Sequence, residues 1–182
     1  QYYVVTPSKC AYIGMDAVLK NYEDRFVLCD GVQKLDEELT VFSAVPGREL
    51  WSGANDTLRE KIGEDYPRDT FRHEQDLLIT ENGKTALFAG CAHCGIVNIL
   101  KSAEDALGRA PDAVFAGFHL YNPSLGKSEP DELVDAVGEK LRGDKVAHYF
   151  TGHCTGKEAY ERLKRKLGDR LGEMPAGSDF TV

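Results

Sequence analysis

Hydrophobic and polar residues follow two patterns along the chain, and the change comes near residue 76. Before it, short β-branched or apolar runs at 2–5, 25–29 and 39–45 are separated by turn formers such as Asp30-Gly31 and Pro46-Gly47. Runs of this kind predict strands, with a short helix expected over 16–22. The first third of the chain is therefore predicted to be strand-rich.

From residue 76 onward, strand and helix patterns alternate. Apolar runs at 77–80 and 85–89 flank Asn82-Gly83, a strong signal for a β-hairpin. Apolar residues then recur at helical spacing over 96–107, 133–141 and 159–167, and two runs typical of strands, 113–117 and 146–150, lie between them. Strands that alternate with amphipathic helices indicate an α/β layer architecture.

The segment 46–72 interrupts this pattern. It is polar, holds the only tryptophan, Trp51, and shows little periodicity, so we expect a long surface loop. Loops of that length in compact domains often act as functional lids. We find no internal repeat and no linker, and expect a single domain, or one piece of a domain, over 1–182.

Composition narrows the class of protein. The net charge of -8 argues against nonspecific attraction to nucleic acid, and no apolar run reaches the length of a membrane span. We therefore expect a cytoplasmic protein with neither a nucleic-acid nor a membrane partner. Three of the five cysteines (Cys91, Cys94 and Cys154) lie beside histidines in glycine-rich turns. This placement favours metal or thiol chemistry over a disulfide framework, and we expect the three to be reduced thiols.

Three histidines follow three predicted strands. His93 lies within Gly-Cys-Ala-His-Cys-Gly, His119 comes directly after the strand 113–117, and His153 lies within Thr-Gly-His-Cys-Thr-Gly. Strand ends are where α/β proteins gather their ligand-binding loops, and imidazole is the commonest nitrogen ligand for zinc-like ions. The pattern predicts one shared metal site, although scattered surface histidines would give the same spacing. His148, inside a strand pattern, is expected to face a neighbour or solvent.

Four motifs in order resemble one branch of the metallo-β-lactamase superfamily, the branch of dihydropterin-ribofuranosyl-aminobenzene phosphate synthase-like proteins, or class II metal-dependent hydrolases. The motifs begin at His73-Glu74-Gln75-Asp76, Gly90-Cys91-Ala92-His93-Cys94-Gly95, Gly117-Phe118-His119-Leu120 and Thr151-Gly152-His153-Cys154-Thr155-Gly156. The resemblance implies an αββα fold with a two-metal centre. It assigns His93 and His153 as metal ligands, and places His119 where the superfamily usually has a bridging aspartate. His73, followed by Glu74 just before a strand, is expected to be a hydrogen-bonded loop histidine; support of the metal ligands by His73 and Glu74 is the other interpretation.

The superfamily signature His-x-His-x-Asp-His, which supplies most of the metal ligands and the usual proton acceptor, occurs nowhere in this sequence. We therefore expect a C-terminal half of the fold, with the N-terminal metal-motif half cut away or carried on another chain. The implied activity is metal-assisted hydrolysis of a phosphate- or ester-containing small molecule, with zinc as the expected ion and manganese or iron as alternatives. No catalytic residue can be assigned in this chain, which we expect to be weak or inactive alone.

Thr155 and Gly156 precede a predicted helix, whose exposed N–H groups would attract a substrate phosphate. Thr155 as a simple helix cap explains the same residues equally well.

Two other functions of the protein remain open. Cys91-Ala-His-Cys94 between a strand and a helix is also typical of a thiol-disulfide redox protein. A non-catalytic half-fold that associates with a partner or forms a homo-oligomer is the third possibility.

Overall fold

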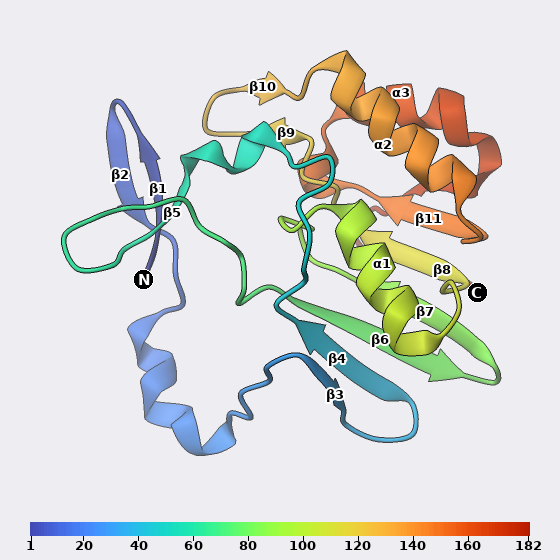
Figure 1. Ribbon diagram of the computed structural model, residues 1–182, viewed down its shortest axis with the longest axis horizontal. Helices are drawn as coiled ribbons and strands as arrows, with labels where there is room; N and C mark the ends of the chain where they lie inside the picture. Colours follow the sequence, from blue (N-terminus) through green and yellow to red (C-terminus); the bar gives the residue numbers. More distant parts are fainter.

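The computed structural model describes residues 1–182 and is built around one mixed sheet of seven strands, in the order β12-β11-β8-β7-β6-β4-β3 (Figure 1). Its strands are β3 (Val32–Lys34), β4 (Leu39–Ser43), β6 (Gln75–Glu81), β7 (Lys84–Phe88), β8 (Ala113–Ala116), β11 (His148–Thr151) and β12 (Leu171–Glu173). Strands β3, β4, β6 and β7 pair antiparallel, whereas β7, β8, β11 and β12 are parallel neighbours. The loops that follow β7, β8 and β11 therefore meet at one edge of the sheet.

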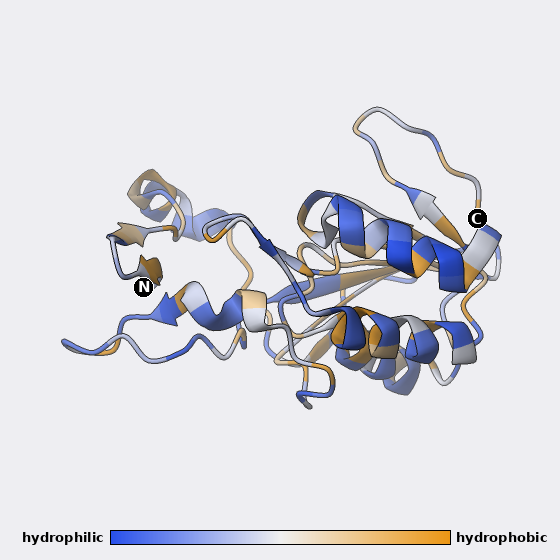
Figure 2. Cartoon of the chain, turned by 90° about the horizontal axis from the view of Figure 1, so that it is seen from above, coloured by the Kyte–Doolittle hydropathy of each residue, from blue (hydrophilic) through white to orange (hydrophobic).

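Three α-helices connect the parallel strands: α1 (Ile96–Leu107), α2 (Asp131–Gly143) and α3 (Lys157–Leu167). Helix α1 ends at Gly108, whose φ of 73° is a left-handed conformation that glycine adopts without steric cost. Helix α2 begins after Pro130 and carries acidic residues in its first turn and basic residues in its last, as the helix dipole favours. Figure 2 shows polar and apolar residues alternating along these helices, in keeping with amphipathic elements that cover a sheet.

The core lies between the helices and one face of the large sheet. Every second side chain along the central strands faces the helices and is buried against their apolar residues. The resulting cluster includes Leu78, Leu87, Val114 and Tyr149 from the strands, and Ile99, Val137 and Leu163 from the helices. Each such leucine or isoleucine contributes about 1.5–3 kcal/mol relative to full exposure. The buried hydroxyl of Tyr149 donates a hydrogen bond to Asp144, and the carbonyl oxygen of Leu141 lies 3.3 Å from the same hydroxyl.

The other face of the sheet carries a row of aromatic side chains. Phe115 stacks between Phe88 and Phe150, with ring centroids 4.8 and 4.9 Å away. Phe180, from the C-terminal tail, packs against Phe150 at 4.3 Å. Phe88 nevertheless stays 38% exposed, so the tail covers only part of this row.

The N-terminal region forms a separate three-stranded sheet, β2-β1-β5, at the left of Figure 1 and away from the large sheet in both views. Its strands are β1 (Tyr2–Thr6), β2 (Lys9–Tyr12) and β5 (Leu58–Glu60). The predicted helix is the 3-10 helix η1 (Ala17–Arg25), and the predicted strand at 25–29 is wrong. Val27 and Leu28 are 74% and 92% exposed, and they lie in no strand because no neighbouring strand pairs with them.

The segment 46–72 differs from the surface loop expected there. It contains the 3-10 helix η2 (Gly53–Thr57) and strand β5, and several of its side chains are buried. Those side chains include Ser52, Asn55, Asp69 and Phe71. The low periodicity reflects a segment whose buried groups are mainly polar and hydrogen bonded.

Short elements complete the fold. The two-stranded ribbon of β9 (Tyr121–Asn122) and β10 (Lys127–Ser128) precedes α2, and the 3-10 helices η3 (His153–Thr155) and η4 (Gly168–Arg170) flank α3. None of the helices combines the length and the hydrophobicity needed to cross a bilayer.

Candidate active site

The three turns at the carboxyl edge of the sheet bring two of their histidines into contact and place the third on the neighbouring turn. His93 follows β7, His119 follows β8 and His153 follows β11, and these strands are adjacent and parallel. The rings of His93 and His119 lie 4.1 Å apart between centroids. His153 is close enough for its charge to act on His119 and on the thiol of Cys91. The geometric reason is that parallel strands end at a common edge.

The His93 ring is held on several sides. Its Nδ1 lies 3.0 Å from Oδ1 of Asn55, and the ring stacks on Phe71 at 4.6 Å with an interplanar angle of 5°. The carboxylate of Glu74 accepts hydrogen bonds from the backbone N–H groups of His93 and Cys94, at 2.6 and 2.7 Å. The ring and the backbone of this turn are therefore both fixed by residues outside it.

His119 is 5% exposed, and neither of its ring nitrogens has a hydrogen-bond partner. Burial, followed by the nearby charge of His93, lowers the pKa of His119 to about 4, so its ring is neutral near neutral pH. Its backbone carbonyl accepts a hydrogen bond of 2.6 Å from the hydroxyl of Ser52. A neutral imidazole is the form that binds metal ions, and buried polar atoms normally have partners.

His119 and His153 share an uncommon backbone conformation. Their φ angles are 46° and 52°, in the left-handed region that non-glycine residues rarely adopt, and Ala92 beside His93 has a φ of 56°. Such conformations cost about 1–3 kcal/mol and cluster at functional sites. All three histidine turns thus carry a strained residue at the same edge of the sheet.

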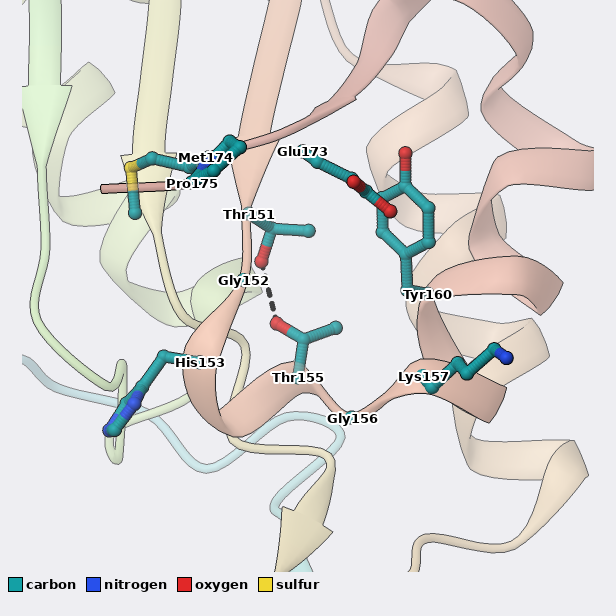
Figure 3. A pocket seen from close by; sticks show the side chains of 10 residues that line it. All are labelled: Thr151, Gly152, His153, Thr155, Gly156, Lys157, Tyr160, Glu173, Met174 and Pro175. Carbon is teal, nitrogen blue, oxygen red and sulfur yellow. Dashed lines mark hydrogen bonds between the residues drawn. The ribbon is translucent and has the colours of Figure 1, made fainter. Parts of the chain in front are cut away.

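Thr155 and Gly156, expected to contact substrate, lie beside His153 in a cavity of about 300 Å³ that Lys157, Tyr160 and Glu173 also line (Figure 3). The hydroxyl and the backbone N–H of Thr155 both make hydrogen bonds within the protein. Its Oγ1 accepts a hydrogen bond from the N–H of Phe118 at 3.0 Å and lies 2.6 Å from Oγ1 of Thr151, and its own N–H donates to the carbonyl of Gly152. Thr155 therefore ties the turns of His119 and His153 together, and a substrate contact by Thr155 or Gly156 stays a prediction.

All five cysteines are free thiols. The three that lie near the histidines occupy two different environments. Cys154 Sγ lies 3.5 Å from the carbonyl oxygen of Cys91. Hydrogen bonding with the side chain of Cys154 lowers the pKa of the Cys91 thiol. Cys94 is buried, with its thiol directed at the carbonyl of Phe71, and burial raises its pKa. Cys91 thus interacts with a cysteine of another turn rather than with Cys94.

Of the residues expected to support the metal ligands, only Glu74 touches the histidine turns. The ring of His73 lies 4.0 Å from that of Tyr2, between centroids, and its Nδ1 lies 3.8 Å from Asp69. It belongs to the junction between the small sheet and the body. Asn55, Ser52 and Phe71, which do hold the site, were not anticipated. The only sequence signal for them was their position in a long segment of the kind that often serves function.

These residues partly fit a metal ion. The two unpartnered nitrogens of the buried, neutral His119, beside His93, are donors of the right chemistry for a zinc-like ion. No group of three or more histidine, cysteine, aspartate or glutamate side chains has the geometry to hold an ion, however. The chain offers a partial donor set in which His153 is near but not converged.

Comparisons with known proteins agree with this fold. No protein-family model matches the chain. It is 29% identical over 101 residues to the 7,8-dihydropterin-6-methyl-4-(beta-D-ribofuranosyl)-aminobenzene-5'-phosphate synthase of Methanocaldococcus jannaschii, a match that covers 55% of this chain and 32% of that protein. It superposes with a TM-score of 0.71 and 20% identity on Tm1679, a metal-dependent hydrolase of the beta-lactamase superfamily, over 85% of this chain and 57% of that one. The chain therefore has the α/β fold that the histidine motifs implied. Its matches cover about a third of the synthase and somewhat over half of the hydrolase.

Proposed function

We propose that this chain provides one side of the active site of a metal-dependent hydrolase that acts on a phosphate- or ester-containing small molecule. The observation that carries the proposal is the pair His93 and His119, with the unpartnered ring nitrogens of a buried His119 at the carboxyl edge of the sheet. The fold shared with a metal-dependent hydrolase supports it. A relative whose name includes a phosphate ester supports the substrate class.

In this proposal His93 and His119 hold the ion, and His153 joins them. A bound divalent ion, zinc in the first instance, would supply a water of lowered pKa and polarise the bond to be cleaved. Glu74, Asn55 and Phe71 keep His93 in place, and Thr155 keeps the His119 and His153 turns in register. Lys157, which lines the same cavity as His153 but lies on its opposite side in Figure 3, offers a positive charge to an anionic substrate.

We further propose that the remaining ligands come from outside this sequence, because two imidazoles leave an ion largely coordinated by water. A segment with His-x-His-x-Asp-His, on a separate chain or upstream, would supply them. The aromatic row of Phe88, Phe115 and Phe150 offers such a segment an apolar face. In keeping with this, a large part of the hydrolase neighbour has no counterpart in this chain.

Calorimetric titration with zinc and with manganese tests the proposal on the chain alone and joined to a segment that carries His-x-His-x-Asp-His. Bis(p-nitrophenyl) phosphate and p-nitrophenyl acetate separate phosphodiester from ester hydrolysis. We expect weak binding and little turnover by the chain alone, and tight binding with turnover by the joined form, lost in His93→Ala and His153→Ala. His148→Ala is the matched control, because His148 lies exposed on β11 outside the site.

Tight stoichiometric binding with turnover by the chain alone would show that its donor set is complete, against the proposed second segment. Absence of metal binding in the joined form would contradict the hydrolase proposal itself. Equal losses in His148→Ala and His153→Ala would contradict the assignment of His153.

A further inference from the structure

We propose that Asn55 is a positioning residue that fixes His93 as the tautomer protonated at Nδ1. Asn55 lies on η2, 38 residues before His93, and its side chain makes two hydrogen bonds to that one residue. The Nδ2 of Asn55 donates to the carbonyl oxygen of His93 at 2.8 Å, and the Oδ1 of Asn55 lies 3.0 Å from the Nδ1 of His93.

The first of these bonds sets the orientation of the amide. A carbonyl oxygen only accepts hydrogen bonds, so the NH₂ group of Asn55 must face the carbonyl of His93. The amide oxygen of Asn55 then faces Nδ1, and because that oxygen also only accepts, Nδ1 must carry the proton. In a singly protonated ring the lone pair of His93 then lies on Nε2.

Asn55 is held rigidly enough for this role. Asn55 is 3% exposed. The neighbouring N–H of Ala54 donates to Oε1 of Glu129 at 2.6 Å, and the carbonyl of Ala54 accepts from Nδ2 of Asn122 at 3.0 Å. These contacts bind η2 to the segment that follows His119, so the amide of Asn55 cannot turn without breaking buried hydrogen bonds.

The stack on Phe71 fixes the plane of the His93 ring, while Asn55 selects the nitrogen that is protonated. Resting on the proposed function, this arrangement presents Nε2 of His93 as a metal ligand beside His119. Partners on the far nitrogen of a ligating histidine are known to fix its tautomer and raise its basicity, and their loss typically costs 10–100-fold in metal affinity.

The tautomer can be measured on the full metal-free chain, independently of any activity. Two-bond ¹H–¹⁵N correlation spectra of the chain labelled with ¹⁵N-histidine report which ring nitrogen is protonated. We expect His93 to be protonated at Nδ1 alone, to become a mixture of tautomers in Asn55→Ala, and to remain protonated at Nδ1 in Asn55→Asp, which retains the acceptor.

Asn98→Ala is the matched control. Asn98 is also buried and donates to backbone carbonyls, those of Cys94 and Glu49, but it contacts no histidine ring, so its loss should leave the tautomer unchanged. Backbone amide spectra establish that each variant is folded. With zinc as the probe, we expect the dissociation constant of Asn55→Ala to rise 10–100-fold, against little change in Asn98→Ala.

Protonation of His93 at Nε2 alone, a doubly protonated ring, or an unchanged tautomer in folded Asn55→Ala would each overturn the inference. Failure of the hydrolase proposal would appear differently. In that case the tautomer and its response to Asn55→Ala would be as expected, while neither the chain nor its joined form bound zinc.

Discussion

The carboxylate of Glu74 receives the backbone N–H of His93 at 2.6 Å, so a charged side chain on one segment fixes a turn nineteen positions later. Because the second carboxylate oxygen receives the N–H of Cys94, Glu74→Gln should lose one charge-assisted hydrogen bond. We expect the free energy of unfolding in urea to fall by about 1.5–3 kcal/mol. Glu37→Gln is the control, because Glu37 is 96% exposed. Equal stability of the two variants would contradict this role of Glu74.

Asp76 gives the protein a predictable pH dependence. It is 1% exposed and its oxygens have no partner, and burial, followed by the charge of Glu74, raises its pKa from 3.8 to about 8. The unfolded state releases this proton at lower pH than the folded state, so Asp76 reduces stability progressively as pH rises from about 4 to about 8.

Asp76→Asn should therefore gain stability relative to the natural chain across this pH range, on the order of 5 kcal/mol in total. Urea unfolding of both proteins at several pH values measures the difference. An effect of the substitution that does not depend on pH would separate the two curves of unfolding free energy against pH by a constant amount. Curves that stay parallel would show that Asp76 does not titrate in this way.

Gly117 allows the turns of Cys91 and Cys154 to approach each other. A Cβ at residue 117 would lie 2.6 Å from Cys154 Sγ and 3.3 Å from the carbonyl oxygen of Gly90. We expect Gly117→Ala to lower stability by about 1–3 kcal/mol through overpacking. Because Cys154→Ala removes the sulfur, the double variant should lose less than the sum of the single losses. Gly143→Ala, where a Cβ meets nothing within 4 Å, is the control. Additive losses would contradict the proposed contact.

Thr155→Val should leave the buried N–H of Phe118 without an acceptor. We expect a loss of about 1–3 kcal/mol in the free energy of unfolding and faster hydrogen exchange at the Phe118 amide. Thr155→Ser should retain most of the stability because it keeps the hydroxyl. If Thr155 instead served only to contact substrate, Thr155→Val would unfold like the natural chain.

Replacement of His119 should separate metal binding from folding. His119→Leu removes two buried nitrogens that have no partners, so the metal-free chain should be as stable as before or more stable. In the form joined to a segment with His-x-His-x-Asp-His, stabilisation by added zinc should disappear, because the ligand is gone. Thermal unfolding with and without zinc measures both effects. A zinc-dependent shift that survives in His119→Leu would exclude His119 as a ligand.

Local sequence pattern was sufficient for most of the elements that pack on the large sheet. Asn82-Gly83 joins β6 to β7 as expected, and the apolar spacing located α1, α2 and α3 within a few residues. Periodicity succeeded there because each element buries one regular face against the core. The prediction failed at 25–29. Val27 and Leu28 lie in an apolar run typical of a strand, but no other strand lies next to them to pair with. Strand propensity depends strongly on that context.

The histidines of the site could be found in the sequence because each follows a strand, and parallel strands share an edge. Their supports could not. Asn55 meets His93 across 38 residues and Cys154 meets Cys91 across 63, through irregular segments with no periodicity that could indicate a contact. Backbone hydrogen bonds and burial fix the partners of a strand or a helix, whereas the partner of a loop side chain depends on where the whole fold places that loop. The chain's local chemistry therefore indicated the candidate ligands, and only the tertiary structure decided which groups hold those side chains.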